Sequence, residues 1–166
     1  MAKTGTEPIA VLLLESELEQ LESGAHVRDL LTIPRVIALE PSRFRTPRLL
    51  RDAAPVRQAK RLRFPGEPRV IVLYHPVQYL LARALCARYA GAELWYARPE
   101  PAALAVAGGD ARVDLPELDR LACERATPLR IIDRDGEADG QLRARLRELG
   151  IISQRPFVPW ARIDRR

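Results

Sequence analysis

The stretch Ile9-Ala-Val-Leu-Leu-Leu14 is an uninterrupted apolar run that ends at Glu15 and Ser16. Further short apolar runs follow along the chain, at Val36–Leu39, Val70–Tyr74, Leu94–Ala97 and Leu129–Ile132. The runs are continuous rather than alternating, and β-branched residues are common in them, which is typical of strands covered on both faces of a parallel sheet. These runs therefore predict the strands of one parallel β-sheet.

Helical patterns separate the expected strands, at 17–31 with a break at Gly24, at 46–62, at 77–89, from Asp114 onward, and at 141–149 with Gly150 as terminator. Asp114 and Glu117 have the spacing of a capping box. Strand–helix repeats with right-handed crossovers place helices on both faces of one sheet. The sequence thus predicts a single three-layer Rossmann-like α/β domain over 1–152, with a mainly parallel five-stranded sheet, and an irregular basic tail over 153–166. The expected strand order is 3-2-1-4-5, with the flavodoxin-like order 2-1-3-4-5 as the alternative, because periodicity does not separate them.

Composition limits the class of protein. The chain has 166 residues, of which 47% are hydrophobic and 30% charged, as in an ordinary globular domain. No apolar run approaches the roughly 20 residues that cross a bilayer, and the start lacks the features of a signal peptide. We expect a cytoplasmic protein, with peripheral membrane association as an alternative. Cys86 and Cys123 are expected as reduced, buried thiols, and no metal or other cofactor is expected.

Polar residues follow every expected strand. Because the carboxyl ends of parallel strands gather at one edge of the sheet, where ligands bind in such folds, these residues form the candidate site. His75 and Glu40 are the candidate catalytic pair, since an imidazole can act as acid, base or phosphate-binding cation, and Glu40, or alternatively Glu15, can orient it if the strands are adjacent. The candidate ligand-binding residues are Ser16, Arg43, Arg98 and Asp133. The alternative is ordinary loop chemistry, in which His75 caps a helix through its ring.

Several motifs of known chemistry are absent. No G-x-G-x-x-G or P-loop follows the first expected strand, where Glu15-Ser-Glu17 would repel a pyrophosphate, so classical dinucleotide binding is disfavoured. A G-x-S-x-G elbow is missing as well, which leaves a hydrolase triad without its nucleophile. The acids of Asp133-Arg-Asp-Gly-Glu137 are read as a turn that leads into a helix rather than as a metal site.

The chain is basic, with a formal net charge of +5. Between Arg43 and Arg69 a run of basic residues is accompanied only by Asp52 and Glu67. Such a stretch predicts an anionic partner, which can be nucleic acid, a membrane surface or an acidic protein. A solvated helix face, or a coding bias toward arginine, would give the same pattern.

Three segments carry a resemblance to a known family. Val36-Ile-Ala-Leu-Glu-Pro41, Val70-Ile-Val-Leu-Tyr-His-Pro76 and Ala92-Glu-Leu-Trp-Tyr-Ala97 resemble, in this order, the N-terminal half of bacterial GT-B glycosyltransferases over about residues 30–100. The resemblance implies a Rossmann-like acceptor-side domain whose strand-end loops face a cleft and whose basic helices often lie on membranes. GT-B enzymes bind the nucleotide-sugar donor with a second such domain, for which this chain has no room. Catalysis would therefore need a second domain or a partner subunit.

The sequence leads to two hypotheses. In the first, the domain is related to glycosyltransferase acceptor domains and binds a phosphorylated or sugar-like ligand, such as a nucleotide-sugar, at the carboxyl edge of its sheet. His75 and Glu40 would be central, with Arg43 and Arg98 as anion contacts. In the second, the chain is a non-catalytic module whose 43–69 stretch binds nucleic acid, an anionic membrane or an acidic protein. Whether the chain is an enzyme stays open at this point.

Overall fold

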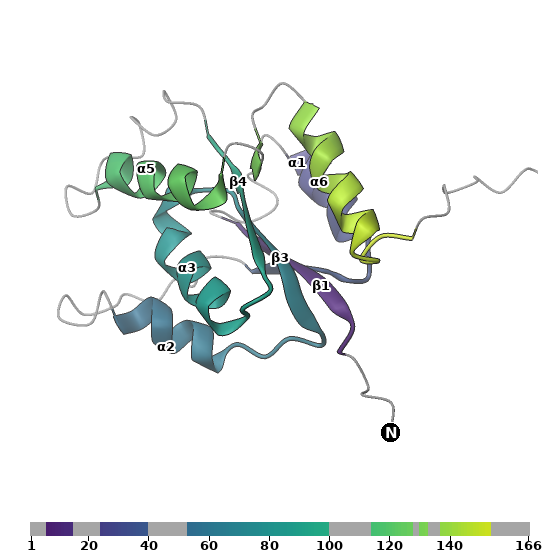
Figure 1. The fold of residues 1–166 in the computed structure, drawn as a ribbon, viewed down its shortest axis with the longest axis horizontal. Helices are drawn as coiled ribbons and strands as arrows, with labels where there is room; N and C mark the ends of the chain where they lie inside the picture. Colours follow the sequence, from purple (N-terminus) through teal and green to yellow (C-terminus); the bar gives the residue numbers. More distant parts are fainter. Residues whose placement is uncertain are drawn as a thin grey trace, which may run out of the picture.

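A five-stranded parallel sheet forms the centre of the protein (Figure 1). The computed structural model describes residues 6–14, 24–39, 53–99, 114–127, 130–132 and 137–153. Its strands are β1 (Pro8–Leu13), β2 (Val36–Leu39), β3 (Glu67–Leu73), β4 (Glu93–Ala97) and β5 (Ile131–Ile132). Every neighbouring pair of strands runs parallel. The predicted fold class, a single Rossmann-like α/β domain, is confirmed.

The order of the strands is β2-β1-β3-β4-β5. The expected order 3-2-1-4-5 is wrong, and the flavodoxin-like alternative is the one found. The physical reason lies in burial. The central strands β1 and β3 are almost completely buried, whereas three of the four residues of β2 are only partly buried. The longer apolar strands take the middle of the sheet, and the short β2 lies at its edge.

Helices cover both faces of the sheet (Figure 1). On one face lie α2 (Ala53–Arg61), α3 (Tyr79–Arg88) and α5 (Leu115–Ala126); on the other lie α1 (Gly24–Leu31) and α6 (Glu137–Glu148). Alternate residues of each strand enter the two cores. Val11 and Leu13 pack toward α2, α3 and α5, whereas Ala10 and Leu12 pack toward α1 and α6. Burial on both faces is why the strands read as continuous apolar runs.

Local signals place the helix ends. The Asp114 side chain accepts a hydrogen bond of 3.1 Å from the backbone N–H of Glu117, as expected for an N-cap. The second half of the capping box is absent, because the Glu117 carboxylate binds Arg120 instead of reaching back. Gly150 ends α6 with φ +72, a left-handed conformation that glycine adopts at low cost.

Other expectations concern cysteines, the tail and membrane spans. Cys86 is buried, Cys123 is partly buried, and both are free thiols. The expected basic tail lies outside the described residues from 154 onward. Across the described ranges, no helix is both long and apolar enough to cross a membrane.

Candidate functional site

The strand order defines a switch point between β1 and β3. The chain leaves β1 toward β2 on one side and then returns across β1 to β3 on the other. In doubly wound sheets, ligands bind outside the carboxyl ends of the strands at this point, because the connections diverge and leave a crevice. Leu13 and Leu73 are partners in the β1–β3 register, so the two strands end side by side.

His75 lies at this edge, two residues after the end of β3. It is the N-cap of the short 3-10 helix η3 (Pro76–Gln78), and its Nδ1 accepts a 3.2 Å hydrogen bond from the backbone N–H of Val77. The residue is only 5% exposed. The expected alternative, a histidine that caps a helix through its ring, is therefore present. The Nδ1 nitrogen is thus used as an acceptor by the backbone of η3.

Gln78 fastens the two strand ends to each other. Its side-chain Nε2 donates to the backbone carbonyl of Leu14, the residue that follows β1. The contact joins η3, which follows β3, to the end of the neighbouring strand. Gln78 was not among the residues singled out from the sequence, because nothing in its local pattern indicates which strand its side chain reaches.

The expected pairing of His75 with Glu40 is not favoured by the strand order. That pairing required β2 and β3 to be adjacent, but β1 lies between them. Two inter-strand spacings separate their backbones by about 10 Å. Both strands do end at the same edge, because both run parallel to β1. The alternative partner, Glu15, follows β1, which is the neighbour of β3. Glu40 and Glu15 themselves lie outside the described residues, as do Ser16, Arg43 and Asp133.

Arg98, which follows β4, is held by α5. Its guanidinium donates to Asp119 through Nε at 3.1 Å and through Nη2 at 2.7 Å. Asp119 also accepts a 2.7 Å hydrogen bond from the Tyr96 hydroxyl. The Arg98 side chain is 44% exposed, whereas that of Asp119 is 9% exposed. The expected anion contact, Arg98, thus has its charge balanced by Asp119 within the protein.

The protonation of this cluster follows from its hydrogen bonds. Burial acts to raise the pKa of Asp119, but the hydrogen bonds from Arg98 and Tyr96 outweigh it and hold that pKa below its usual range. Burial, reinforced by the Asp119 carboxylate, raises the pKa of Tyr96. At neutral pH the cluster is therefore an ionised carboxylate between a guanidinium and a neutral phenol. Asp119 could have been noticed in the sequence as an acid in the apolar stripe of α5, four residues after Leu115 and three before Ala122.

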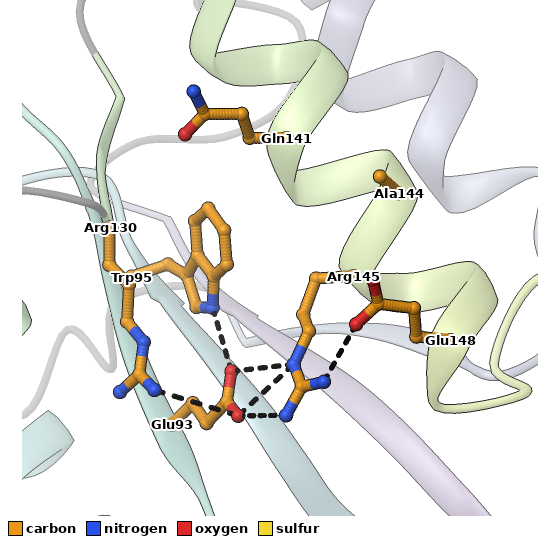
Figure 2. A pocket seen from close by; sticks show the side chains of 7 residues that line it. All are labelled: Glu93, Trp95, Arg130, Gln141, Ala144, Arg145 and Glu148. Carbon is orange, nitrogen blue, oxygen red and sulfur yellow. Dashed lines mark hydrogen bonds and ion pairs between the residues drawn. The ribbon is translucent and has the colours of Figure 1, made fainter.

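A hollow of about 330 Å³ lies elsewhere, between β4 and α6. Figure 2 shows the side chains that line it, with the Glu93 carboxylate between two arginines. Arg145 donates to both Glu93 oxygens, and Trp95 Nε1 lies 3.4 Å from one of them. Arg130 Nη2 is 3.6 Å from Glu93, and Arg145 also binds Glu148 at 2.8 Å.

This hollow lies where α6 packs against the sheet, and it is separate from the strand-end site. Glu93 is the first residue of β4, so the hollow lies at the amino end of that strand. Among the described residues, β5 pairs with Tyr96 and Ala97, the last two residues of β4, and not with its start. The hydrogen bond from Arg145 is the main reason that the pKa of Glu93 is lowered. The network fastens α6 to the sheet, and sequence reasoning did not identify it.

Comparison with known proteins adds no relative: no family model, curated protein or solved structure matches this chain. Metal chemistry has no visible site either, since the described residues contain no group of three or more His, Cys, Asp or Glu side chains placed to hold an ion. The candidate site accordingly rests on the β1–β3 switch point and on the side chains that reach it.

Proposed function

We propose that this domain binds a phosphorylated or sugar-like small molecule at the carboxyl edge of its sheet, in the crevice between β1 and β3. The observation that carries the proposal is the strand order, which puts the switch point of a doubly wound sheet at these two strand ends. Binding at that position is the general rule for open parallel α/β sheets, whatever the ligand.

His75 supports a ligand that offers oxygen acceptors. His75 lies beside the proposed site as the N-cap of η3, and an imidazole side chain is able to hydrogen-bond phosphate and sugar oxygens alike. The Gln78–Leu14 contact ties η3 to the end of β1, and a site whose parts are held together before binding pays less entropy when the ligand binds.

An arginine-rich segment that follows β2 in the sequence supports an anionic ligand. Residues 40–52 join the carboxyl end of β2 to the start of α2, and they carry Arg43, Arg45, Arg48 and Arg51 against Glu40 and Asp52. Arginine is well suited to phosphate because its planar fork donates two parallel hydrogen bonds. Arg43 keeps its role as an anion contact in the proposal, whereas Arg98 becomes a secondary contact because Asp119 balances its charge.

The proposal is limited to binding. An acid–base pair of His75 and Glu40 would have to bridge strands that are not neighbours, because β1 lies between β2 and β3. If the chain is the acceptor-side half of a GT-B-like enzyme, turnover would use a donor domain supplied by another chain or segment.

The test is a thermal-shift titration with UDP-glucose, glucose 1-phosphate and inorganic phosphate. The informative variant is His75→Asn, because asparagine retains a good N-cap acceptor while the imidazole is removed. The wild type should gain thermal stability with at least one of these probes, and His75→Asn, measured against its own ligand-free Tm, should lose most of that gain.

The matched control is the same substitution at the other histidine, His26→Asn, which should keep the ligand-induced shift. The proposal fails if none of the probes shifts the wild type, or if His75→Asn responds as the wild type does.

A further inference from the structure

Basic side chains gather on the solvent side of α2 and α3. Arg57, Lys60 and Arg61 on α2 and Arg83 on α3 are exposed, and we call these four side chains the basic face. At 100° per residue the three α2 positions fall within one arc of about 100°, opposite the buried Ala59. The two helices pack on the same face of the sheet (Figure 1).

Acidic residues are rare in the segment that contains α2 and α3. Between positions 53 and 92 the sequence contains a single acid, Glu67, and Arg69 binds it at 3.2 Å. None of the four cations of the basic face forms an ion pair with another described residue. Elsewhere in the described ranges arginines commonly do: Arg35 binds Glu7, Arg98 binds Asp119, Arg120 binds Glu117, Arg143 binds Asp29 and Arg145 binds Glu93.

Two neighbouring arginines have a structural use and are not counted in the basic face. Arg88 of α3 donates to the backbone carbonyls of Ala59 and Leu62, and its guanidinium lies 5.0 Å from the Tyr89 ring centroid. Arg63 donates to the Lys60 carbonyl at 2.9 Å. These contacts satisfy the end of α2, where cations also complement the helix dipole. They place the carboxyl ends of α2 and α3 together, so the helices run side by side in the same direction.

The scarcity of exposed apolar side chains on α2 and α3 indicates which class of anionic partner the basic face suits. A membrane-bound helix needs exposed large apolar side chains, and a protein interface needs an apolar centre. Of the described large hydrophobic side chains on α2 and α3, Val56, at 44%, is the exposed one. The aromatic pair Phe64–Tyr89 is packed edge to face at a centroid separation of 6.0 Å, and Arg88 lies over Tyr89, which leaves no platform for unstacked bases. Contacts to a duplex phosphate backbone need cations alone.

We propose that the basic face of α2 and α3 binds double-stranded nucleic acid through its phosphate backbone, without reading base sequence. This activity goes beyond the small-molecule site, since it uses solvent-facing side chains of two helices and not the strand ends. With one phosphate contact for each of the four cations, log K should fall with log salt at a slope of about −3.6. Between about 50 and about 200 mM salt the affinity should then drop by about a hundredfold.

The experiment measures fluorescence anisotropy of a labelled duplex of about 20 base pairs, as DNA and as RNA, across this salt range. The test variant is Arg57→Gln/Lys60→Gln/Arg61→Gln, and Arg83→Gln is measured separately. The triple variant should reduce the salt slope by about 2.7 and weaken binding at low salt by tenfold or more, while Arg83→Gln should reduce the slope by about 0.9. Scrambling the base sequence of the duplex should change nothing.

A matched control removes the same net charge from other surfaces. Arg28→Gln/Arg125→Gln/Arg147→Gln acts on exposed arginines of α1, α5 and α6, each of which follows or precedes an acid in the sequence. This variant should bind the duplex nearly as the wild type does. Circular dichroism checks that both triple variants are folded.

Three outcomes would overturn the proposal. The first is equal loss of binding in the two triple variants, since the effect would then belong to net charge alone. The second is a duplex affinity that does not respond to salt. The third is tighter binding at the same salt to phosphatidylserine vesicles or polyglutamate than to the duplex, since the face would then serve another class of partner.

Discussion

Arg98, at the end of β4, and Asp119, in the middle of α5, are joined by two hydrogen bonds of 3.1 and 2.7 Å. Tyr96 donates a third to the same carboxylate from the buried side. The Asp119 carboxylate thus lies between α5 and β4, and the hydrogen bonds that it accepts come from Tyr96 of β4 and from Arg98, which directly follows β4. This arrangement fastens α5 to the sheet at the edge where the ligand site is proposed.

Replacing Asp119 by asparagine should destabilise the protein by about 1–3 kcal/mol. The amide keeps the shape of the carboxyl group but removes the negative charge that pairs with Arg98. Its NH2 group is a donor and would lie next to the N–H or O–H donors that Asp119 accepts from. The cost stays below that of a fully buried pair because Arg98 is partly exposed to water. Urea denaturation of the two proteins gives the difference in free energy of unfolding.

Glu117→Gln on the same helix is the control for Asp119→Asn. Glu117 pairs with Arg120 on the solvent side of α5, and exposed pairs contribute about 0–1 kcal/mol. A larger loss in Glu117→Gln than in Asp119→Asn would contradict the anchoring role of Asp119.

The stability of the protein should fall as the pH drops below about 4, in part through Asp119 and Glu93. The folded-state pKa of each carboxyl is lowered, chiefly by a hydrogen bond from Arg145 for Glu93 and, against burial, by hydrogen bonds from Arg98 and Tyr96 for Asp119. A lowered folded pKa gives stability that is present above the unfolded pKa and is lost as the pH falls through the folded one.

The pH dependence can be assigned with the double variant Asp119→Asn/Glu93→Gln. Its free energy of unfolding should be lower than that of the wild type at pH 7, and the difference should shrink as the pH falls from about 5 toward about 2. Denaturation curves at a series of pH values provide the measurement. A difference that stays constant over this range would show that neither carboxyl titrates with a lowered pKa.

The architecture could be predicted because it depends on local signals. Strands buried on both faces must be apolar at every position, and the runs at Ile9–Leu14 and Val70–Tyr74 indicate this directly. Strand order does not leave such a mark, because the period of a strand carries no information about its neighbour. Length is the one local clue: the β2 run has four residues against six in β1 and seven in β3, which suits an edge position, and the expected order 3-2-1-4-5 did not use it.

The candidate site was only partly predictable for a related reason. Its position at the strand ends follows from chain direction, and His75 is found there. Its partners depend on which elements pack together: Gln78 reaches Leu14 because β1 and β3 are neighbours, and Asp119 reaches Arg98 because α5 covers β4. An acid within an apolar helix stripe, such as Asp119, is nevertheless a signal that could be searched for in a sequence alone.

The two glycines at positions 66 and 140 should respond to alanine with opposite signs. A Cβ at Gly66 would meet the Glu7 carbonyl oxygen and the Ile9 side chain at the start of the β1–β3 pairing, so backbone would have to move. Overpacking of this kind costs about 1–3 kcal/mol. At Gly140, within α6, nothing lies within 4 Å, and alanine should add about 0.5–1 kcal/mol through helix propensity. Urea midpoints of Gly66→Ala and Gly140→Ala test both signs, and equal shifts would refute the close approach at Gly66.

The Cys86 thiol should be inert in the folded protein. It is 7% exposed, and burial raises its pKa despite the opposing charges of Arg125 and Arg130. Since the thiolate is the reactive form, both access and ionisation slow its alkylation. In a Cys123→Ser background, iodoacetamide should modify Cys86 only as fast as the protein opens, and fully in denaturant. Mass spectrometry follows the reaction with time. Labelling in native buffer at the rate of a small free thiol would contradict the burial of Cys86 in the core on this face of the sheet.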